Sequence, residues 1–232
     1  MDTHLDGFLN INKPSGMTSY DVIRFIKKIP GFKSRIGHTG TLDPLASGVL
    51  VVCIGRATRK AGKFLAMEKE YLATLLLGIT TDTDDIQGKV LESSQINPEA
   101  IDERQIYKTI RSFSGEIEQV PPSVSALRKQ GVRLYKLHRQ GRPVIPEPRK
   151  VFIYEIEVKK IEIPRIVFRV VCSRGTYIRA LCRDIGKKLG YGAVQESLIR
   201  LRVGKFTIEN AVELRQLNEK NLQKYIIPSS EV

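Results

Sequence analysis

The sequence contains few of the residues that build redox and metal sites. It has three cysteines and three histidines among 232 residues. Because Cys53, Cys172 and Cys182 are odd in number and widely spaced, they are interpreted as reduced thiols of a cytoplasmic protein. There is no Cys-x-x-Cys pair and the histidines lie far apart, so no zinc site is expected. We predict a protein without a metal.

Long apolar runs and targeting signals are also missing. The N-terminal segment has no basic region followed by an apolar stretch, and no apolar run approaches the roughly 20 residues needed to span a bilayer. No glycine-rich loop leads into Gly-Lys-Ser or Gly-Lys-Thr, which argues against a cradle for nucleotide phosphates. These absences predict a cytoplasmic protein with no membrane partner.

Acidic residues are outnumbered by basic ones. The chain has 38 Lys and Arg against 25 Asp and Glu, for a formal net charge of +13. A polyanion is therefore the expected partner, with nucleic acid the leading candidate. This charge alone would suffice for a non-catalytic RNA-binding or RNA-folding protein, so it does not by itself indicate an enzyme.

Hydrophobic patterning predicts an α+β fold. The predicted strands and helices are mixed without regular alternation, which favours a mixed, largely antiparallel central sheet with flanking helices. The length allows a single domain over 1–232. Residues 120–148 are rich in Pro, Gly, Arg and Lys and predict an exposed basic insertion. Strands are expected at 7–11, 49–54, 70–79, 151–163, 166–172 and 198–206, and helices after Thr18 or Ser19, over 57–65, from Asn97-Pro98, over 176–189 and near Val212.

One carboxylate lies in an unusual setting. Asp43 stands among glycines and small hydroxyl residues, directly before the apolar run 49–54. Pro44 biases Asp43 away from helix, and the glycines allow the backbone to pass close to a ligand. An acid on a rigid loop beside the core suits a reactive group. An Asp before Pro is also ordinary turn chemistry, and the local pattern alone favours that simpler interpretation.

A second group of polar residues follows the strand that ends at Cys172. Gly175 turns the chain, and Tyr177 and Arg179 stand at the start of a helix. If Arg179 reaches Asp43, a bidentate pair would keep that carboxylate ionised. A phosphate-facing arginine beside a core tyrosine explains the pattern equally well.

The acidic segment 82–88 departs from a calcium loop, because Ile86 and Gln87 occupy the positions of a ligand and of the glycine. The segment is typical of a solvated turn.

Taken in order along almost the whole chain, these motifs resemble the TruB family of tRNA pseudouridine synthases. No single motif suffices, but the ordered set is specific. The matching segments are Lys13-Pro14-Ser15-Gly16-Met17-Thr18-Ser19, Gly37-His38-Thr39-Gly40-Thr41-Leu42-Asp43-Pro44, Lys69-Glu70-Tyr71, Thr81-Asp82-Thr83-Asp84, Val120-Pro121-Pro122-Ser123-Val124-Ser125-Ala126, Gly131-Val132-Arg133-Leu134-Tyr135, Ser173-Arg174-Gly175-Thr176-Tyr177-Ile178-Arg179, and Leu198-Ile199-Arg200 with Gly204.

The resemblance implies the pseudouridine synthase fold and isomerisation of uridine at position 55 in the tRNA T-loop, without a cofactor. It implies that Asp43 is the nucleophile, with attack on uracil C6 or ribose C1′ left open. By the same resemblance, Tyr71 stacks on the target base and helps to remove the C5 proton. Arg179 is expected to pair with the nucleophile.

Further residues are expected to bind the RNA. Chemistry on a base requires the nucleotide to leave the stack, and His38 matches a residue that fills space near the flipped nucleotide. Tyr177 and Leu198 match residues that line the base pocket, and Lys13 belongs to a matching motif. The insertion matches a segment that closes over the RNA loop. Its candidate contacts are Arg128, Lys129, Arg133, Lys136 and Arg139.

Two departures from the family pattern bear on the prediction. His138 stands where relatives often carry a small residue. The chain also stops soon after Pro228, so a C-terminal RNA-binding domain of the PUA type is expected to be missing. The T-arm would then be recognised by the catalytic domain of a monomer. The missing domain argues against a guide-RNA-dependent synthase of the dyskerin type, and Asp43, Tyr71 and Arg179 together argue against a non-catalytic protein.

Overall fold

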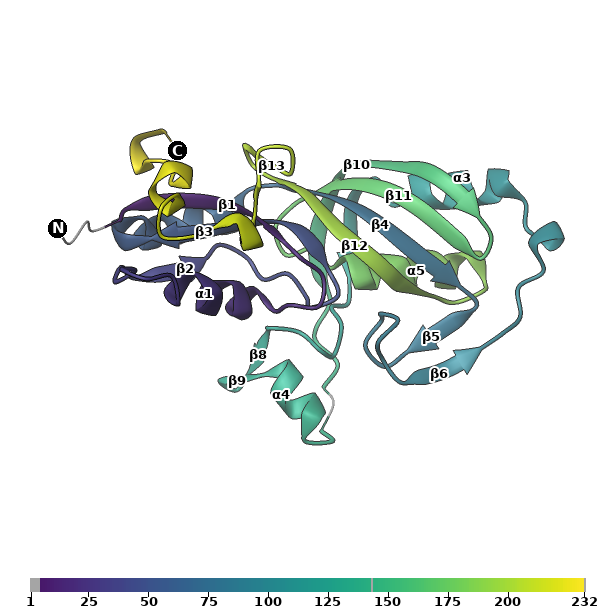
Figure 1. Ribbon diagram of the computed structural model, residues 1–232. Helices are drawn as coiled ribbons and strands as arrows, with labels where there is room; N and C mark the ends of the chain where they lie inside the picture. The colour runs from purple at the N-terminus through teal and green to yellow at the C-terminus, as the bar shows by residue number, and fades with distance from the viewer. Residues whose placement is uncertain (1–4, 143, 232) are drawn as a thin grey trace. The chain divides into compact units, whose positions relative to one another are not determined.

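The computed structural model describes residues 5–142 and 144–231, and Pro143 of the insertion lies outside the described residues. The chain forms two compact units (Figure 1). The first joins the chain up to Tyr71 to the chain from Leu198 onward, and the second spans Leu72–Ser197. Strands β4 (Lys69–Leu77) and β12 (Ala193–Val203) cross the boundary and contribute to both units.

The first unit is built around two long antiparallel strands. β1 (Gly7–Lys13) pairs with β3 (Ser47–Ile54) along its whole length. β14 (Val212–Glu213) adds in parallel to β1, and β12 adds in parallel to β3. The remaining elements are β2 (Ile36–His38) beside β3, β13 (Phe206–Thr207) beside β12, the helices α1 (Ser19–Lys27) and α2 (Ala61–Ala66), and 3-10 turns at Gly55–Lys60, Leu214–Gln216, Leu222–Tyr225 and Ser229–Glu231.

Both faces of β1 and β3 are covered, which explains the unbroken apolar run of β3. Alternate side chains of the two strands pack on α1 and the C-terminal turns through residues such as Leu50, Val52 and Ile26. The opposite set packs on a cluster of three aromatic rings, in which Phe64 lies 4.7 Å from Phe8 between ring centroids. A strand with one solvent-exposed face would instead alternate between apolar and polar residues. β3 is therefore a central, buried strand.

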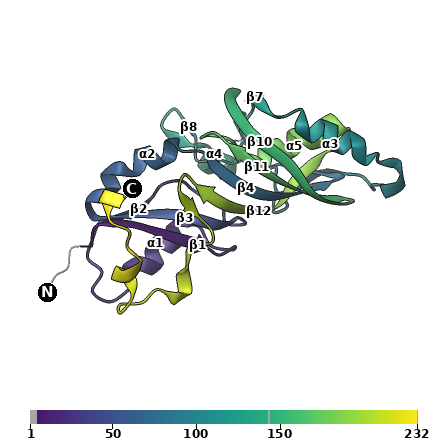
Figure 2. The ribbon, with the colours of Figure 1, turned by 90° about the horizontal axis from the view of Figure 1, so that it is seen from above.

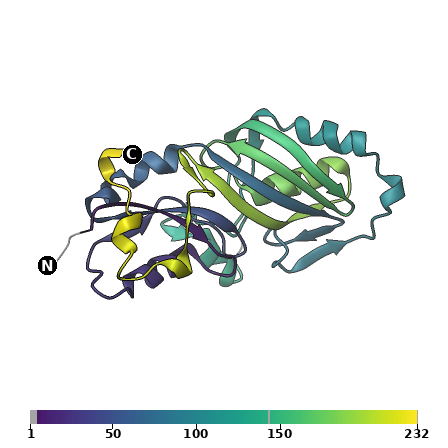
Figure 3. The ribbon, with the colours of Figure 1, turned by 45° about the horizontal axis from the view of Figure 1, so that its top comes forward.

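The second unit places two helices on one face of a sheet. β10 (Arg149–Glu162) lies between β11 (Arg165–Cys172) and β7 (Gly115–Gln119), and all three are antiparallel. β11 is followed in strand order by β4. α3 (Glu103–Arg111) and α5 (Ile178–Leu189) pack against each other beside these strands (Figures 2 and 3). Smaller elements are the hairpin of β5 (Ile79–Thr81) with β6 (Val90–Ser93), the pair β8 (Arg128–Lys129) and β9 (Val132–Arg133), the helix α4 (Leu134–Arg139) and a turn at Pro98–Ala100.

The predicted α+β class, with its mixed and largely antiparallel sheet, is confirmed, and some element limits were wrong. Asn97 caps only a short 3-10 turn, and α3 begins at Glu103 because Asp102 caps it. Val212 itself lies in a strand that extends the sheet beside β1, and the short helix expected near it is the 3-10 turn Leu214–Gln216. In the described part of the chain, no helix is long and apolar enough to cross a membrane. The single-domain organisation over 1–232 stays a prediction.

Candidate active site

Asp43 lies on the loop that connects β2 to β3, in the first unit. The loop begins with Thr39, whose N–H donates to the carbonyl of Val51 at 3.0 Å. It ends in a turn in which the N–H of Ala46 donates to the carbonyl of Asp43 at 3.1 Å. Asp43 itself is half-buried. The loop is thus ordered by its own backbone directly before the central strand.

Two buried side chains from distant segments hold this loop. The Ser19 hydroxyl accepts from the N–H of Leu42 at 2.9 Å and donates to the carbonyl of the same residue at 3.1 Å. Arg200 donates from Nε to Val49 O at 2.7 Å and from Nη2 to Gly40 O at 3.1 Å. Both side chains are at least 97 % buried, with exposures of 2 % and 3 %. Buried donors of this kind fix the backbone that presents Asp43.

Gly48 explains how Arg200 comes so close. Its φ is +100°, and a Cβ atom there would lie 2.3 Å from the backbone oxygen of Arg200. Only glycine adopts this conformation readily and leaves room for β12 to pass. The Gly48 position thus brings Arg200 over the Asp43 loop.

Lys13 is a third buried group at the loop. Its ammonium donates to the carbonyl of Met17 at 2.6 Å and to that of Pro14 at 2.9 Å, and lies 3.5 Å from the carbonyl of Pro44. Burial lowers the pKa of Lys13 to about 8, although the Asp43 carboxylate opposes this shift. A partly neutral lysine at pH 8 would attract Asp43 less strongly.

The pH dependence of Lys13 predicts opposite trends in stability and activity. Between pH 8 and the ordinary pKa of 10.5, the folded protein binds fewer protons at Lys13 than the unfolded chain does. The Lys13 contribution to the free energy of unfolding should therefore rise with pH over this window, by up to about 3 kcal/mol. Activity should fall over the same window, because the ammonium that faces Asp43 is lost.

Urea unfolding and kcat/KM, each measured from pH 7 to 10 on wild type, Lys13→Met and Lys13→Arg, test this expectation. The difference in unfolding free energy between wild type and Lys13→Met should increase with pH. Lys13→Arg keeps its charge and should show no alkaline fall in activity near pH 8. An unchanged alkaline fall in Lys13→Arg would assign that limb to another group.

Other residues predicted for the site also belong to the first unit. His38 is half-buried at the end of β2, and its Nδ1 accepts from the N–H of Gly40 at 3.4 Å. Tyr71 lies on the buried face of β4 with 8 % exposure. Lys69 stands two residues earlier on the same face, and its ammonium donates to the carbonyl of Leu65 at 2.9 Å, at the end of α2. Leu198 is buried on β12.

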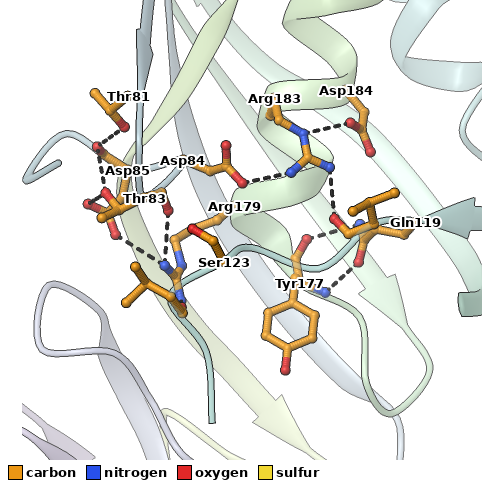
Figure 4. Close-up of polar contacts among 12 residues, drawn as sticks. Thr81, Thr83, Asp84, Asp85, Gln119, Ser123, Tyr177, Arg179, Arg183 and Asp184 are labelled. Carbon is orange, nitrogen blue, oxygen red and sulfur yellow. Dashed lines mark hydrogen bonds and ion pairs between the residues drawn. The ribbon is translucent and has the colours of Figure 1, made fainter. Parts of the chain in front are cut away.

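Arg179 and Tyr177 belong to the second unit, at the start of α5 (Figure 4). Arg179 is 5 % exposed, and its guanidinium donates to the carbonyls of Thr83 and Val124, both at 3.0 Å. Its Nη1 lies 3.5 Å from a carboxylate oxygen of Asp85. The pairing of Arg179 with Asp43, a residue of the first unit, stays a prediction.

The acidic turn beside Arg179 is not solvated, contrary to the sequence-based interpretation. The side chains of Asp84 and Asp85 are 14 % and 13 % exposed. Asp84 adopts φ of 61° and pairs with Arg183 at 2.7 Å. Burial raises the pKa of Asp84, while Arg183 and Arg179 oppose the rise. Arg179 and Arg183, one helical turn apart on α5, thus balance the negative charge of these two carboxylates.

The insertion contains ordered elements. Arg128 and Arg133 lie on β8 and β9 and are exposed, and their contact with RNA stays a prediction. The guanidinium of Arg133 lies 6.0 Å from the ring centroid of Tyr135. His138, the departure noted above, has its Nε2 3.4 Å from Asp82 Oδ2. The histidine therefore contacts the same acidic turn.

In the part of the chain that the structure describes, the thiols and the residue types that bind metals give no sign of a second site. Burial raises the pKa of the Cys53 thiol to about 12, so this cysteine is a poor nucleophile. Within residues 5–142 and 144–231, no group of His, Cys, Asp and Glu side chains is arranged to hold a metal ion.

Comparison with known proteins assigns the family. A model of the TruB family pseudouridylate synthase N-terminal domain matches residues 27–178, more than half of the chain. The chain belongs to the TruB family. A model of the tRNA pseudouridylate synthase B C-terminal domain matches residues 179–230. The predicted family is therefore confirmed, and this TruB chain is a pseudouridine synthase by descent.

Individual relatives agree with this assignment. The tRNA pseudouridine synthase B of Clostridium tetani is 48% identical over 225 residues, which cover 97% of this chain and 77% of that protein. The protein of the same name from Syntrophomonas wolfei is 46% identical over 230 residues, covering 97% and 76%. Among solved structures, a Cbf5-Nop10-Gar1 complex contains a chain that matches with a TM-score of 0.72 and 33% identity. That match covers 96% of this TruB chain and 60% of the other.

Sequence reasoning missed the parts that Ser19 and Arg200 play in holding the Asp43 loop. Ser19 was considered as a helix cap and as the end of a matching motif, and Arg200 only as part of a motif. A charged residue inside an apolar strand pattern was the available signal for Arg200, because such a residue is buried only with partners.

Proposed function

We propose that this protein isomerises uridine 55 of the tRNA T-loop to pseudouridine, with Asp43 as the nucleophile. The observation that carries the proposal is the Asp43 loop in a TruB chain. The carboxylate of Asp43 stands on a loop whose backbone is hydrogen-bonded by the buried side chains of Lys13, Ser19 and Arg200. The choice of tRNA is supported by the relatives, which are named tRNA pseudouridine synthase B.

The reaction is an isomerisation. The C1′–N1 bond breaks, a C1′–C5 bond forms, the proton leaves C5 and N1 gains a proton. Because atoms and electrons balance within the nucleotide, the step requires no oxidant or reductant. Covalent attack by Asp43 on C6 or on C1′ would hold the base and sugar through the exchange. A fixed loop suits either route, since both require the carboxylate at one position beside an everted base.

The supporting residues take the roles that the resemblance implies. Arg179 would keep the nucleophile ionised, and Tyr71 would stack on the base and assist removal of the C5 proton. His38, Tyr177 and Leu198 would surround the everted nucleotide. The buried position of Tyr71 on β4 supports its place beside a base, because a base pocket excludes water.

Phosphate contacts would come from the basic surface. With a formal charge of +13, the chain would attract RNA without regard to sequence. Arg128 and Arg133 on the insertion are exposed, which supports the inference that they contact the T-arm. We place the enzyme in the cytoplasm and infer that it acts as a monomer, since each residue assigned to the reaction is supplied by one chain.

A guide-RNA-dependent reaction has less support. The matching chain of the Cbf5-Nop10-Gar1 complex is 33% identical to this chain. The relative from Clostridium tetani, which is named tRNA pseudouridine synthase B, is 48% identical. We therefore infer direct recognition of tRNA.

Mapping of pseudouridine at nucleotide resolution tests the proposal. An unmodified tRNA transcript should acquire pseudouridine at position 55 without guide RNA, and a transcript with cytidine 55 should acquire none. An isolated T-arm hairpin should keep kcat/KM within about tenfold of full tRNA, a difference of about 1.4 kcal/mol. Modification elsewhere would refute the position. A much larger loss on the hairpin would show that recognition extends beyond the T-arm.

A further inference from the structure

Gln119 is a fully buried amide at the end of β7, and both of its polar atoms contact one residue. Its Oε1 accepts from the backbone N–H of Tyr177 at 2.8 Å. Its Nε2 donates to the backbone carbonyl of Tyr177 at 3.0 Å. The two residues are 58 positions apart in sequence. The amide side chain thus pairs with the Tyr177 backbone as a neighbouring strand would (Figure 4).

Tyr177 is the residue that precedes α5, and its own side chain does not cap the helix. It is extended, with φ of −102° and ψ of 111°, and its carbonyl also accepts from the N–H of Leu181 at 3.0 Å. N–H groups at a helix start need partners from outside the helix. Gln119 supplies an acceptor for the Tyr177 N–H and a second donor for its carbonyl, so it fixes the backbone from which the Tyr177 ring projects. In Figure 4 the ring points away from the Arg183 contacts.

Gln119 also lies where the insertion begins. The segment that follows it, 120–125, is bound to α5 at two further points. Arg183 Nη2 donates to the carbonyl of Val120 at 2.8 Å, and Arg179 Nη2 donates to that of Val124 at 3.0 Å. The Ser123 hydroxyl donates to the carbonyl of Asp82 at 3.2 Å. Because β7, which ends at Gln119, pairs with β10 and these contacts hold the chain that follows, Gln119 has little freedom to move away from Tyr177.

We propose that Gln119 is a positioning residue for uridine isomerisation and that it acts through Tyr177. Gln119 fixes the position of the Tyr177 ring relative to the everted base. It also links the Tyr177 backbone to the first residues of the insertion. This inference rests on the proposed role of Tyr177 in the base pocket. Gln119 itself touches no substrate.

A double-mutant cycle separates this role from a general structural one. The single-turnover rate constant is measured with saturating tRNA for wild type, Gln119→Leu, Tyr177→Ala and the double variant, and the Kd for tRNA is measured separately. Gln119→Leu should lower the rate constant about 10- to 100-fold, in the range for a misplaced active-site group. The Kd should change less than about threefold, a difference below 1 kcal/mol. In the Tyr177→Ala background the same change should cost less than about twofold, because residues that act as a unit are not additive.

Gln195→Leu is the matched control. Gln195 is 1 % exposed, also lies on a strand of the second unit, and in the described part of the chain neither of its side-chain polar atoms has a hydrogen-bond partner. The same substitution of a buried glutamine should leave the rate constant within about twofold of wild type, because no bond is lost.

Gln119→Glu gives a second readout. Its carboxylate still accepts from the Tyr177 N–H but repels the carbonyl, whereas the protonated acid can donate to that carbonyl. The rate constant of this variant relative to wild type should therefore rise as the pH falls. A ratio of the two rate constants that does not change with pH would contradict the bond to the carbonyl. The Gln119→Glu measurement also keeps the inference testable if Gln119→Leu loses its cooperative thermal transition.

The outcomes distinguish the inference from its premise. If Tyr177→Ala leaves turnover unchanged, the base-pocket role of Tyr177 fails. If Tyr177→Ala is impaired and Gln119→Leu multiplies its defect in full, Gln119 does not act through Tyr177 and the inference is overturned. A loss confined to tRNA affinity would also overturn it.

Discussion

Asp43→Asn should abolish formation of pseudouridine while tRNA binding remains close to that of wild type. The amide has nearly the shape of the carboxylate but cannot act as the nucleophile. When the covalent nucleophile is removed from a set of catalytic residues, kcat falls on the order of 10⁴- to 10⁶-fold. The loop should remain ordered, because Ser19 and Arg200 hold its backbone through Leu42, Gly40 and Val49.

Single-turnover assays with mapped tRNA, together with a direct measurement of the Kd, check this result. Asp102→Asn is the matched control: Asp102 caps α3, and asparagine is an equally good cap, so neither activity nor stability should change. Retained turnover in Asp43→Asn would show that another group carries the reaction. A wild-type protein that binds tRNA but never forms pseudouridine would favour the non-catalytic alternative.

The Asp43 loop could be predicted because its signals are local. Glycines, Pro44 and the following apolar run lie within a dozen residues, and each restricts the backbone independently of the rest of the chain. The groups that hold the loop could not be predicted in this way. Ser19 reaches Leu42 across 23 positions, and Arg200 reaches Gly40 across 160. Such contacts depend on the packing of β12 beside β3, which no local pattern contains.

For the acidic turn, the local pattern gave a wrong prediction of solvent exposure. Asp84 and Asp85 were interpreted as solvated, because charged residues in sequence usually lie in water. They are half-buried because α5 presents Arg179 and Arg183 four residues apart, one turn of helix, and these side chains reach the acidic residues from nearly 100 positions away. The family resemblance identified Arg179 as important. Its neighbours Asp85, Thr83 and Val124 became visible only in the fold.

Arg179→Met should reduce both turnover and stability, for separable reasons. Asp85 lies 3.5 Å from the Arg179 guanidinium and is 13 % exposed, and an acid shielded from water costs up to about 3 to 5 kcal/mol without its cation. Turnover should fall by at least about 100-fold, since a charge-assisted contact at the reacting site is lost as well. Urea unfolding and single-turnover assays measure the two effects separately.

The pH dependence of this loss follows from Asp84. Burial already raises the pKa of Asp84, and Arg179 is one of two cations that oppose the rise. Without Arg179 the pKa rises further, so the folded variant holds its proton to higher pH than the unfolded chain does. The stability of the variant then falls as the pH rises through that window. Its deficit relative to wild type should be smallest in acid, and a deficit independent of pH would contradict the electrostatic cause.

Combining Arg179→Met with Asp85→Asn should separate folding from catalysis. Removing both members of a buried ion pair is often nearly neutral, whereas removing one leaves an uncompensated charge. The double variant should therefore regain most of the unfolding free energy lost in Arg179→Met. Turnover should not recover, because neither methionine nor asparagine can supply the cation proposed to keep Asp43 ionised. Recovery of turnover together with stability would mean that Arg179 supports the fold alone, and the proposed pairing with Asp43 would have to be abandoned.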